Sequence, residues 1–513
     1  MEVEAGLTIL QAAEVAGIAI PSLCYHRGLA PCTSCYVCVV GIAGRNGFVP
    51  SCATKVQEGM SVDCSSADVQ SARRTALELL LSDHVGDCAG PCELACPAGL
   101  DVPAMLRAVQ QGQMGQARSI VSHDLAFART LGAFCPGFCE KACRRGRHDA
   151  PLAIRRVHEA LSAAPGDAAS GGASSARSTA ALDCGSSAAN GAVAIEHVQG
   201  KHVRVGNHVC VGKHVCVMGA SAVAVSAAYY LALSGQRVTL LTRGRPLATE
   251  ILAAHPQAAA QLEGDLAQLT ALGIEVDAQP HPAVDVAAIR AACDALLLAD
   301  DTLPADAQVD EAGGVFQAER APKYLVHCVG AGRSLARKID AHLAGATPPL
   351  KPFSIHMGHL QEGEMERFLE LCPGEARVAH IKDPSRPLAA NELPQEAARC
   401  LYCDCRDKRD CRLRLYSAQY RASAVHFGSP RRRFEQQADA TIVYESGKCI
   451  ACGLCVQIAA RDGRANGPAF IGRGFGVRVQ PASGVDMATA LGESAGECID
   501  ACPTGALAWR KET

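Results

Sequence analysis

Cysteine is the residue type that stands out in this sequence, with 27 cysteines among 513 residues. Many of them lie two or three residues apart, which is the spacing of metal ligands. Soft thiolates in such number select zinc or iron–sulfur clusters. A disulfide scaffold is the alternative, but the chain is long, and acidic Glu2 and Glu4 stand where a signal peptide would be basic. We therefore expect a cytoplasmic protein with reduced thiols.

The densest stretch runs from His84 to His158 and holds two cysteine runs on either side of a helical spacer. Two cubane clusters need eight ligands, and six cysteines supply only six. The two flanking histidines would complete the sets, and their neutral rings would raise the cluster potentials. A surface role for each histidine is the alternative, with Glu159 as the next ligand candidate. The cysteines are Cys88, Cys92 and Cys96 in the first run, and Cys135, Cys139 and Cys143 in the second.

Residues 1–70 hold six further cysteines, of which four have the spacing of a ligand set, namely Cys24, Cys35, Cys38 and Cys52. The pattern TILQAAEVAGI has apolar residues at helical spacing, and YVCVVGI and GMSV read as strands. Two irons that each take two terminal thiolates need four cysteines, so this set suits a [2Fe–2S] cluster, with zinc as the alternative. The layout IPSLCYH, CxxC and VPSCAT resembles the plant-type ferredoxin domain of the complex I large iron–sulfur subunit and of related hydrogenase and formate dehydrogenase subunits.

An amphipathic helix pattern, SARRTALELLLSDHVGDC, leads into His84. The motif Cys-x3-Cys-x3-Cys-Pro, with CPGFCEKACRRG and PLAIRRVHE downstream, resembles the N-terminal cluster domain of the glutamate synthase small subunit and dihydropyrimidine dehydrogenase. The resemblance implies two [4Fe–4S] clusters bound crosswise by the two cysteine runs. It assigns His84, Cys88, Cys92 and Cys143 to one cluster, and Cys96, Cys135, Cys139 and His158 to the other.

Residues 214–345 have the outline of a dinucleotide-binding βαβ unit, with strands at Val215–Met218 and Arg237–Leu241 around a turn and a helix. The turn reads Gly219-x-Ser221-x-x-Ala224, so a side chain stands where the second glycine would let the backbone approach a pyrophosphate. The weakly polar run from Val215 to Leu233 consists of the first strand, the turn and the helix of this unit. We therefore do not expect it to span a membrane.

Two later positions also depart from the flavoprotein pattern that this unit resembles. The second strand ends at Thr242 and not at an acidic residue, and Glu319 and Arg320 replace a Gly-Asp that contacts the flavin phosphate. The segment is also short for paired FAD and nicotinamide domains. We therefore predict a degenerate Rossmann-like FAD/NAD(P) domain that serves as a scaffold, with weak FAD binding left open.

Residues 346–425 contain a compact set of four thiols, Cys400-x2-Cys403-x-Cys405-x5-Cys411, after the helical pattern NELPQEAAR. Their number and the surrounding arginines and lysines suit another [4Fe–4S] cluster, because basic side chains would offset the cluster charge or face a partner. Zinc is the alternative here, since C-x2-C pairs also bind zinc.

Residues 426–513 resemble a bacterial-type two-cluster ferredoxin as found in complex I-like and hydrogenase subunits. One ligand set is complete, with Cys449, Cys452, Cys455 and, from the far motif, Cys502 before Pro503. The second set is lost, because Ala459, Gly492 and Ala495 stand at ligand positions and only Cys498 remains. We therefore expect one cluster in this domain.

These segments together predict an α+β and α/β multidomain protein. The expected parts are a plant-type ferredoxin (β-grasp) domain, a helical double-cluster domain, a low-complexity linker that ends in three near-repeats, a degenerate Rossmann-like domain, a cysteine-cluster segment and a bacterial-type ferredoxin domain. Their expected bounds are residues 1–70, 71–163, 164–213, 214–345, 346–425 and 426–513.

We expect one [2Fe–2S] and up to four [4Fe–4S] clusters, and no residue set for substrate chemistry. The expected role is that of a non-catalytic electron-transfer subunit. The resemblances imply two partners, a flavin-bearing NADH-oxidising subunit and a hydrogenase, formate dehydrogenase or similar catalytic subunit. A formal net charge of −3 gives no sign of a nucleic-acid or membrane partner. The alternatives are an NAD(P)H-dependent FAD oxidoreductase like the glutamate synthase small subunit, and a zinc scaffold.

Overall fold

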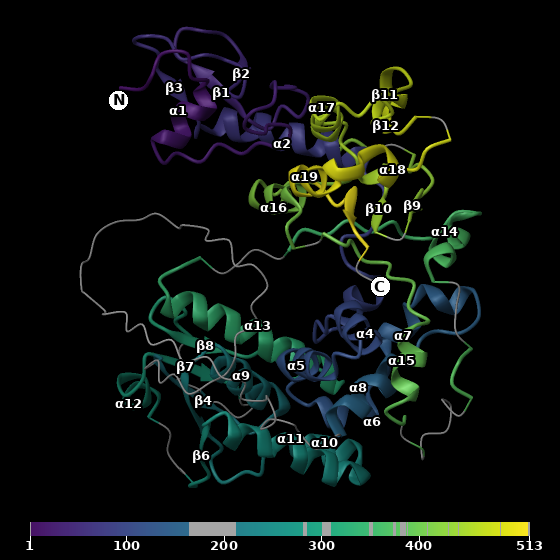
Figure 1. Cartoon of the computed structure of the whole chain (residues 1–513). Helices are drawn as coiled ribbons and strands as arrows, with labels where there is room; N and C mark the ends of the chain where they lie inside the picture. Colours follow the sequence, from purple (N-terminus) through teal and green to yellow (C-terminus); the bar gives the residue numbers. More distant parts are fainter. Residues whose placement is uncertain are drawn as a thin grey trace, which may run out of the picture.

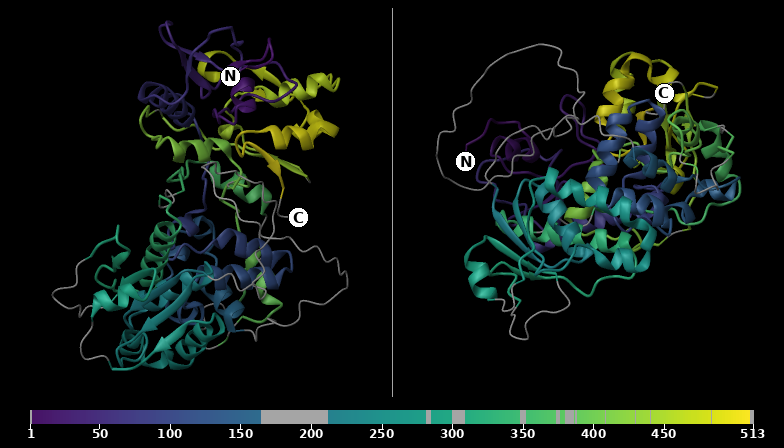
Figure 2. Two further views of the ribbon diagram at one scale, coloured as in Figure 1. Left: turned by 90° about the vertical axis from the view of Figure 1, so that its left-hand side faces the viewer. Right: turned by 90° about the horizontal axis from the view of Figure 1, so that it is seen from below.

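A computed structural model describes residues 2–163 and 212–510, apart from 281–284, 300–308, 348–351, 373–375, 380–385, 387, 408, 429, 440 and 483. The predicted linker therefore lies almost wholly outside the described residues. The described chain is a mixed α/β multidomain protein. Figures 1 and 2 show two halves. The N-terminal and C-terminal elements lie together in one half, and the helices of residues 91–163 lie with a parallel sheet in the other.

The N-terminal part combines one helix with a small antiparallel sheet, as the sequence predicts. Helix α1 (Ile9–Val15) begins at a capping box, in which Thr8 and Gln11 each bind the other's backbone N–H. Its buried face packs against strands ordered β2-β1-β3, with Val40 and Val49 in the same core. The strands are β1 (Val39–Ile42), β2 (Phe48–Pro50) and β3 (Val62–Asp63).

Helix α2 (Ala67–Ser82) connects this part to the first cysteine run. It begins earlier than the apolar pattern indicates, because Ser66 accepts a hydrogen bond from the Val69 N–H and caps it. Arg73 is buried on this helix and donates to the Val39 carbonyl at 3.1 Å and to the Tyr420 hydroxyl at 3.1 Å. The helix therefore holds the N-terminal sheet against a segment near the other end of the chain.

Short helices build the part that carries the two cysteine runs. Their common core contains Met105, Phe127, Leu131 and Val157, all fully buried. Helix α15 (Glu392–Ala397), confirmed at the predicted place, packs on α4, so the segment just before Cys400 lies against this part. The helices are α3 (Pro91–Leu94), α4 (Val102–Gln110), α5 (Met114–Asp124), α6 (Ala128–Phe134), α7 (Phe138–Lys141) and α8 (Ile154–Ala163).

The predicted βαβ unit is part of a five-stranded parallel sheet of order β6-β5-β4-β7-β8. Strand β5 has the predicted bounds, and β4 begins one residue earlier than predicted. The strands are β4 (His214–Met218), β5 (Arg237–Leu241), β6 (Glu275–Asp277), β7 (Ala295–Leu298) and β8 (Val315–Gln317). The helices are α9 (Ala222–Leu233), α10 (Thr249–Ala254), α11 (Ala259–Ala271), α12 (Val286–Ala291) and α13 (Leu325–Leu343).

The C-terminal part brings its two cysteine motifs together through paired strands. Strand β10 lies just before the first motif and pairs with β13, which follows the second motif. The remaining helices are α14 (Glu364–Leu371), α16 (Arg412–Gln419), α17 (Leu454–Arg461), α18 (Met487–Leu491) and α19 (Ala495–Ala501). The strands are β9 (Gln437–Ala438), β10 (Ile442–Tyr444), β11 (Ala469–Ile471), β12 (Arg478–Gln480) and β13 (Leu507–Trp509).

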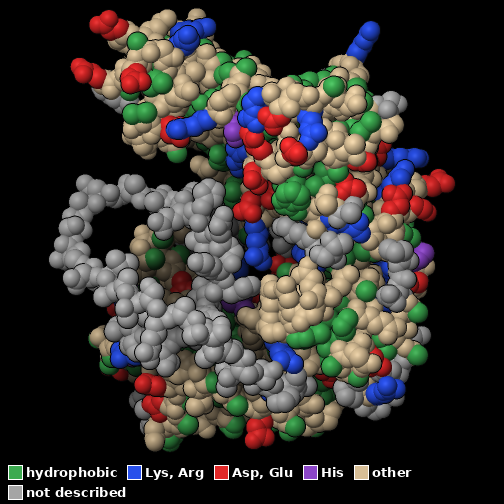
Figure 3. Space-filling view, in the orientation of Figure 1, with side chains coloured by type: hydrophobic (Ala, Val, Ile, Leu, Met, Phe, Trp, Pro, Cys, Tyr) green, Lys and Arg blue, Asp and Glu red, His purple; other side chains and the backbone are tan. Residues whose placement is uncertain are grey.

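The surface seen in Figure 3 carries acidic and basic side chains in alternation, including a column of both signs between the two halves. Among the described residues, no helix has both the length and the apolar character needed to cross a membrane.

Candidate metal centres

The four predicted ligands Cys24, Cys35, Cys38 and Cys52 form two close pairs, and we call them the N-terminal group. Cys24 interacts with Cys35, and Cys38 interacts with Cys52. These interactions lower the pKa of Cys24 and of Cys38 to about 6 each. All four side chains are buried. Two pairs of thiols are the arrangement in which two irons each receive two terminal ligands.

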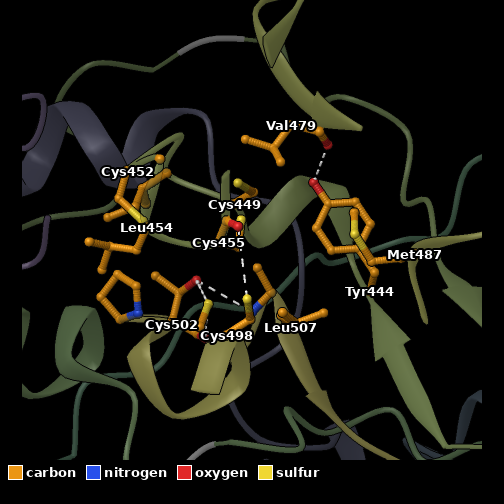
Figure 4. Close-up of a pocket in the computed structure, with 15 residues that line it drawn as sticks. Tyr444, Cys449, Cys452, Leu454, Cys455, Val479, Met487, Cys498, Cys502 and Leu507 are labelled. Carbon is orange, nitrogen blue, oxygen red and sulfur yellow. Dashed lines mark hydrogen bonds between the residues drawn. The ribbon is translucent and has the colours of Figure 1, made fainter. Parts of the chain in front are cut away.

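The C-terminal group consists of Cys449, Cys452, Cys455 and Cys502, which line one pocket (Figure 4). This grouping agrees with the prediction. The same pocket is lined by Cys498, whose thiol donates to the Cys455 carbonyl at 3.8 Å. Cys498 is thus a buried neighbour of the group.

The positions of the lost second ligand set are filled by other side chains. The Arg464 guanidinium lies against Gly492, so a Cβ at this position would displace it. Asp462 accepts a hydrogen bond from the Ser494 hydroxyl at 2.8 Å, and Ala459 is fully buried. These contacts describe the surroundings of the positions at which the sequence lacks the second ligand set.

Cys96, Cys135, Cys139 and His158 form the distal group in the helical part. Burial, Cys96 and Cys135 together raise the pKa of the Cys139 thiol. His158 is buried, and burial lowers its pKa to about 4, so the ring is neutral, which is the form that binds metal. The ring donates to the Ala128 carbonyl, but Nδ1 has no hydrogen-bond partner. A buried ring nitrogen without a partner is compatible with the ligand role that the sequence assigns to His158.

The prediction keeps Cys400, Cys403, Cys405 and Cys411 in one ligand set. In the structure these four cysteines divide between two groups, and each group also contains cysteines of the two runs. Cys400 and Cys403 lie with residues of the two cysteine runs. The four cysteines that line this common pocket, which we call the pocket group, are Cys92, Cys143, Cys400 and Cys403. Sequence reasoning missed this grouping, because the residues come from three distant segments.

Cys405 and Cys411 lie instead beside Cys88, and these three residues are the Cys88 group. The Cys405 N–H donates to the Cys88 carbonyl at 3.4 Å. Burial, Cys405 and Cys88 raise the pKa of Cys411. His84 is nearby: it and Cys405 both border the buried ammonium of Lys448. Burial lowers the pKa of His84 to about 3, and its Nδ1 has no hydrogen-bond partner.

These groups fit clusters better than single ions. Thiolates on one tetrahedral zinc lie about 3.8 Å apart, and among the described residues no three His, Cys, Asp or Glu side chains converge as one ion requires. The described cysteines form no disulfide. Burial and neighbouring thiols raise the pKa of Cys92 and Cys400 well above the ordinary value. A bound metal core would stabilise the thiolate form of these residues.

Neighbouring groups lie next to one another in a series. The Cys24 thiolate of the N-terminal group raises the pKa of Cys452 in the C-terminal group, in addition to burial. Lys448 directly precedes Cys449 and faces Cys405 of the Cys88 group. Cys88 and Cys405 each lie close in sequence to a member of the pocket group, and Cys92 interacts with Cys139 of the distal group. The series therefore runs through both halves of the molecule.

The dinucleotide turn is closed by the chain's own side chains. Ser221 accepts from the Ala224 N–H at 3.3 Å and donates to the Ala299 carbonyl at 3.2 Å. The Ala222 N–H donates to the Glu250 carboxylate at 2.5 Å. A helix N-terminus binds phosphate through such N–H groups. Here a carboxylate takes the position of the phosphate, and Glu250 is a residue that sequence reasoning missed.

Two family models match the chain. Residues 1–67 match the 2Fe-2S iron-sulfur cluster binding domain, and residues 82–164 match dihydropyrimidine dehydrogenase domain II, 4Fe-4S cluster. The chain is therefore a multidomain iron–sulfur protein with a [2Fe–2S] domain followed by a [4Fe–4S] domain.

The chain also has named relatives, each over part of its length. It is 50% identical over 99 residues to the NADP-reducing hydrogenase subunit HndD of Solidesulfovibrio fructosivorans, covering 17% of each chain. It is 40% identical over 99 residues to the NADH-ubiquinone oxidoreductase 78 kDa subunit of Candida albicans, covering 18% of this chain and 14% of the relative. A crystal structure of NAD+-reducing [NiFe]-hydrogenase matches at 38% identity over 16% of this chain and 35% of that chain, with a TM-score of 0.16. The chain thus spans less than a fifth of the length of these two curated relatives, which are subunits of oxidoreductases.

Proposed function

We propose that this chain is an electron-transfer subunit that relays electrons through five iron–sulfur clusters and performs no substrate chemistry of its own. The observation that carries the proposal is the series of five buried ligand groups, each next to another, from Cys24 to His158. A series of close redox centres is what electron transfer through a protein requires. The three groups that include residues outside the family matches extend the same chemistry to the C-terminal half.

Buried positive charges beside the ligand groups support this role. Lys448 is buried next to Cys405 and pairs with Glu445. Arg144 lies beside Cys403 and pairs with Asp87. A cluster with four thiolates is anionic, and nearby cations stabilise the reduced, more negative form. Lys448 and Arg144 would thus help the neighbouring clusters to accept an electron.

We infer two partner subunits. The named relatives are subunits of an NADP-reducing hydrogenase and of an NADH-ubiquinone oxidoreductase. In such complexes a protein of this kind would take electrons from a flavin-bearing NADH-oxidising subunit and pass them to a hydrogenase, formate dehydrogenase or similar catalytic subunit, or carry them in the reverse direction.

The test is the iron, sulfide and flavin content of anaerobically purified protein, with EPR after dithionite reduction. One [2Fe–2S] and four [4Fe–4S] clusters contain about 18 iron atoms per chain. We expect that content, an equal content of sulfide and no flavin. Zinc in place of iron, or an iron content near two, would contradict the proposal.

The second candidate is an NAD(P)H-dependent FAD oxidoreductase, and the parallel sheet is the observation in its favour. Glu250 and Ser221 speak against it, because they bind the N–H groups that a pyrophosphate would need. The two candidates differ in one measurement: a flavin enzyme would carry FAD that NADH or NADPH bleaches, whereas the electron-transfer subunit would be reduced only through a partner or dithionite.

A further inference from the structure

The twelve residues from Cys400 to Cys411 lie between two ligand groups. At the start of this segment, Tyr402 has a positive φ of 45°, so the chain makes a tight turn between Cys400 and Cys403. At its centre, the buried carboxylate of Asp404 receives two hydrogen bonds from Arg107 on α4, at 2.9 and 2.8 Å. This bidentate pair fixes the segment on the helical part.

The cysteines that precede Asp404 in this segment belong to one of the two ligand groups. Cys400 and Cys403 line a pocket together with Cys92 and Cys143, and the remaining lining includes Leu106, Leu152 and Ile154. The electrostatic neighbours of the Cys92 thiol include the same three cysteines. Four thiols around one apolar pocket make a complete ligand set for a cubane cluster.

The cysteines that follow Asp404 in this segment belong to the other ligand group. The Cys405 sulfur lies against Gly505 of the C-terminal part, so that a Cβ at Gly505 has no room. Its backbone N–H donates to the Cys88 carbonyl at 3.4 Å. Cys411, at the start of α16, has Cys405 and Cys88 as its neighbouring thiols. These three cysteines lack one ligand for a cubane.

His84 can supply the missing ligand. It lies four residues before Cys88, directly after α2, and its Nδ1 is buried without a hydrogen-bond partner. The Val85 N–H donates to the Gly447 carbonyl at 2.8 Å, which holds this segment against the residue before Lys448. The Lys448 ammonium is a charged neighbour of both His84 and Cys405. A buried ring nitrogen without a partner is costly unless a metal or proton donor binds it.

We propose that the Cys400–Cys411 segment divides its four thiols between two [4Fe–4S] clusters. Cys400 and Cys403 bind one cluster with Cys92 and Cys143. Cys405 and Cys411 bind a second with Cys88 and His84. The inference rests on the proposed function, in that it takes the groups to hold [4Fe–4S] clusters. It replaces both the crosswise assignment of His84, Cys88, Cys92 and Cys143 and the single set of residues 400–411.

Iron content of the wild-type protein cannot distinguish the two assignments, because both give five clusters. Two double variants distinguish them. Removal of Cys88 and Cys405 deletes one cluster if they share it, and two clusters under the single-set assignment. Removal of Cys403 and Cys405 deletes two clusters under the proposed assignment and one cluster under the single-set assignment. Each variant carries two cysteine-to-alanine changes at buried positions, so each serves as the control for the other.

We expect Cys88→Ala/Cys405→Ala to retain about 14 iron atoms per chain and Cys403→Ala/Cys405→Ala about ten. The reverse order, or equal iron in the two variants, would overturn the inference. The dithionite-reduced EPR signal of the [2Fe–2S] cluster shows that each variant is folded. Cys372→Ala, which removes a buried thiol near Cys400, should keep the full iron content. A wild-type content far below 18 would instead contradict the proposed function.

The His84→Cys variant tests the remaining ligand without the loss of a cluster. Thiolate in place of imidazole adds a negative charge, so one cluster should keep its iron and show a lower midpoint potential by EPR-monitored redox titration. That shifted signal should be absent when Cys405→Ala is added. Unchanged potentials for all clusters would show that His84 is not a ligand.

Discussion

The side chain of Gln457 on α17 binds the backbone of Ala30 in both directions, although the two residues are 427 positions apart. The Ala30 N–H donates to Gln457 Oε1 at 3.1 Å, and Gln457 Nε2 donates to the Ala30 carbonyl at 3.1 Å. The same amide nitrogen lies 2.8 Å from the Cys32 sulfur. This contact holds the loop of the N-terminal group next to Cys452.

Gln457→Ala should loosen this contact and slow electron transfer between the [2Fe–2S] cluster and the C-terminal cluster. Two lost hydrogen bonds cost about 1–3 kcal/mol. Rapid-freeze EPR after rapid reduction would follow the two signals in time. Gln437→Ala, at an exposed glutamine on β9, is the matched control and should behave like the wild type. Equal rates in Gln457→Ala and the control would mean that the contact has no part in the transfer.

Cys502→Ala should remove the C-terminal cluster and about four iron atoms per chain, because it removes one of four ligands in the pocket of Figure 4. Cys498→Ala should keep the cluster, because this thiol only donates to the Cys455 carbonyl. Iron analysis and EPR of both variants make the comparison. Loss of the cluster in Cys498→Ala alone would mean that the ligand assignment is wrong.

Lys448→Gln should lower the midpoint potentials of the two clusters on either side of this residue. The ammonium is buried, and its loss removes a positive charge that favours the reduced state, on the order of 100 mV at an effective dielectric constant of about 20 and a separation of about 7 Å. Redox titration followed by EPR measures the shift. Lys338→Gln, at a half-exposed lysine on α13, should leave all potentials unchanged. A rise in potential would contradict the electrostatic argument.

Glu250→Ala should give the helix α9 N-terminus a measurable affinity for inorganic pyrophosphate. The change frees the Ala222 N–H and removes a competing negative charge. Isothermal titration calorimetry against the wild type and against Glu263→Ala, an exposed glutamate on α11, is the measurement. If the three proteins bind pyrophosphate equally, the carboxylate does not close the site.

Local structure could be predicted well from the sequence, because it depends on neighbouring residues. Strand Arg237–Leu241 and the helix before Cys400 follow from side-chain periodicity. The C-terminal ligand set and the lost second set follow from a compact motif. Helix α2 begins at Ala67 because of the cap at Ser66, a signal that the apolar pattern alone does not contain.

The grouping of thiols between distant segments could not be predicted in this way. Spacing indicates that Cys400 and Cys403 act together, but it carries no information on whether they meet Cys405 or Cys143. The short distance in sequence between Cys403 and Cys405 favours a single set, whereas the pocket places Cys403 with Cys143. Such placement depends on contacts between distant segments, for example the bidentate pair of Arg107 with Asp404, two residues 297 positions apart. Glu250 was missed for the same reason.

The position of Cys400, Cys403, Cys405 and Cys411 also bears on the biosynthesis of the protein. A ribosome that has made the two cysteine runs has still to add about half of the chain before the partners of Cys88, Cys92 and Cys143 exist. The [2Fe–2S] domain and the distal group contain all their ligands early. The other sites stay incomplete until the segment from Cys400 to Cys411 has been made. Cluster insertion should therefore occur in two stages, and the second stage is the one that oxygen would interrupt.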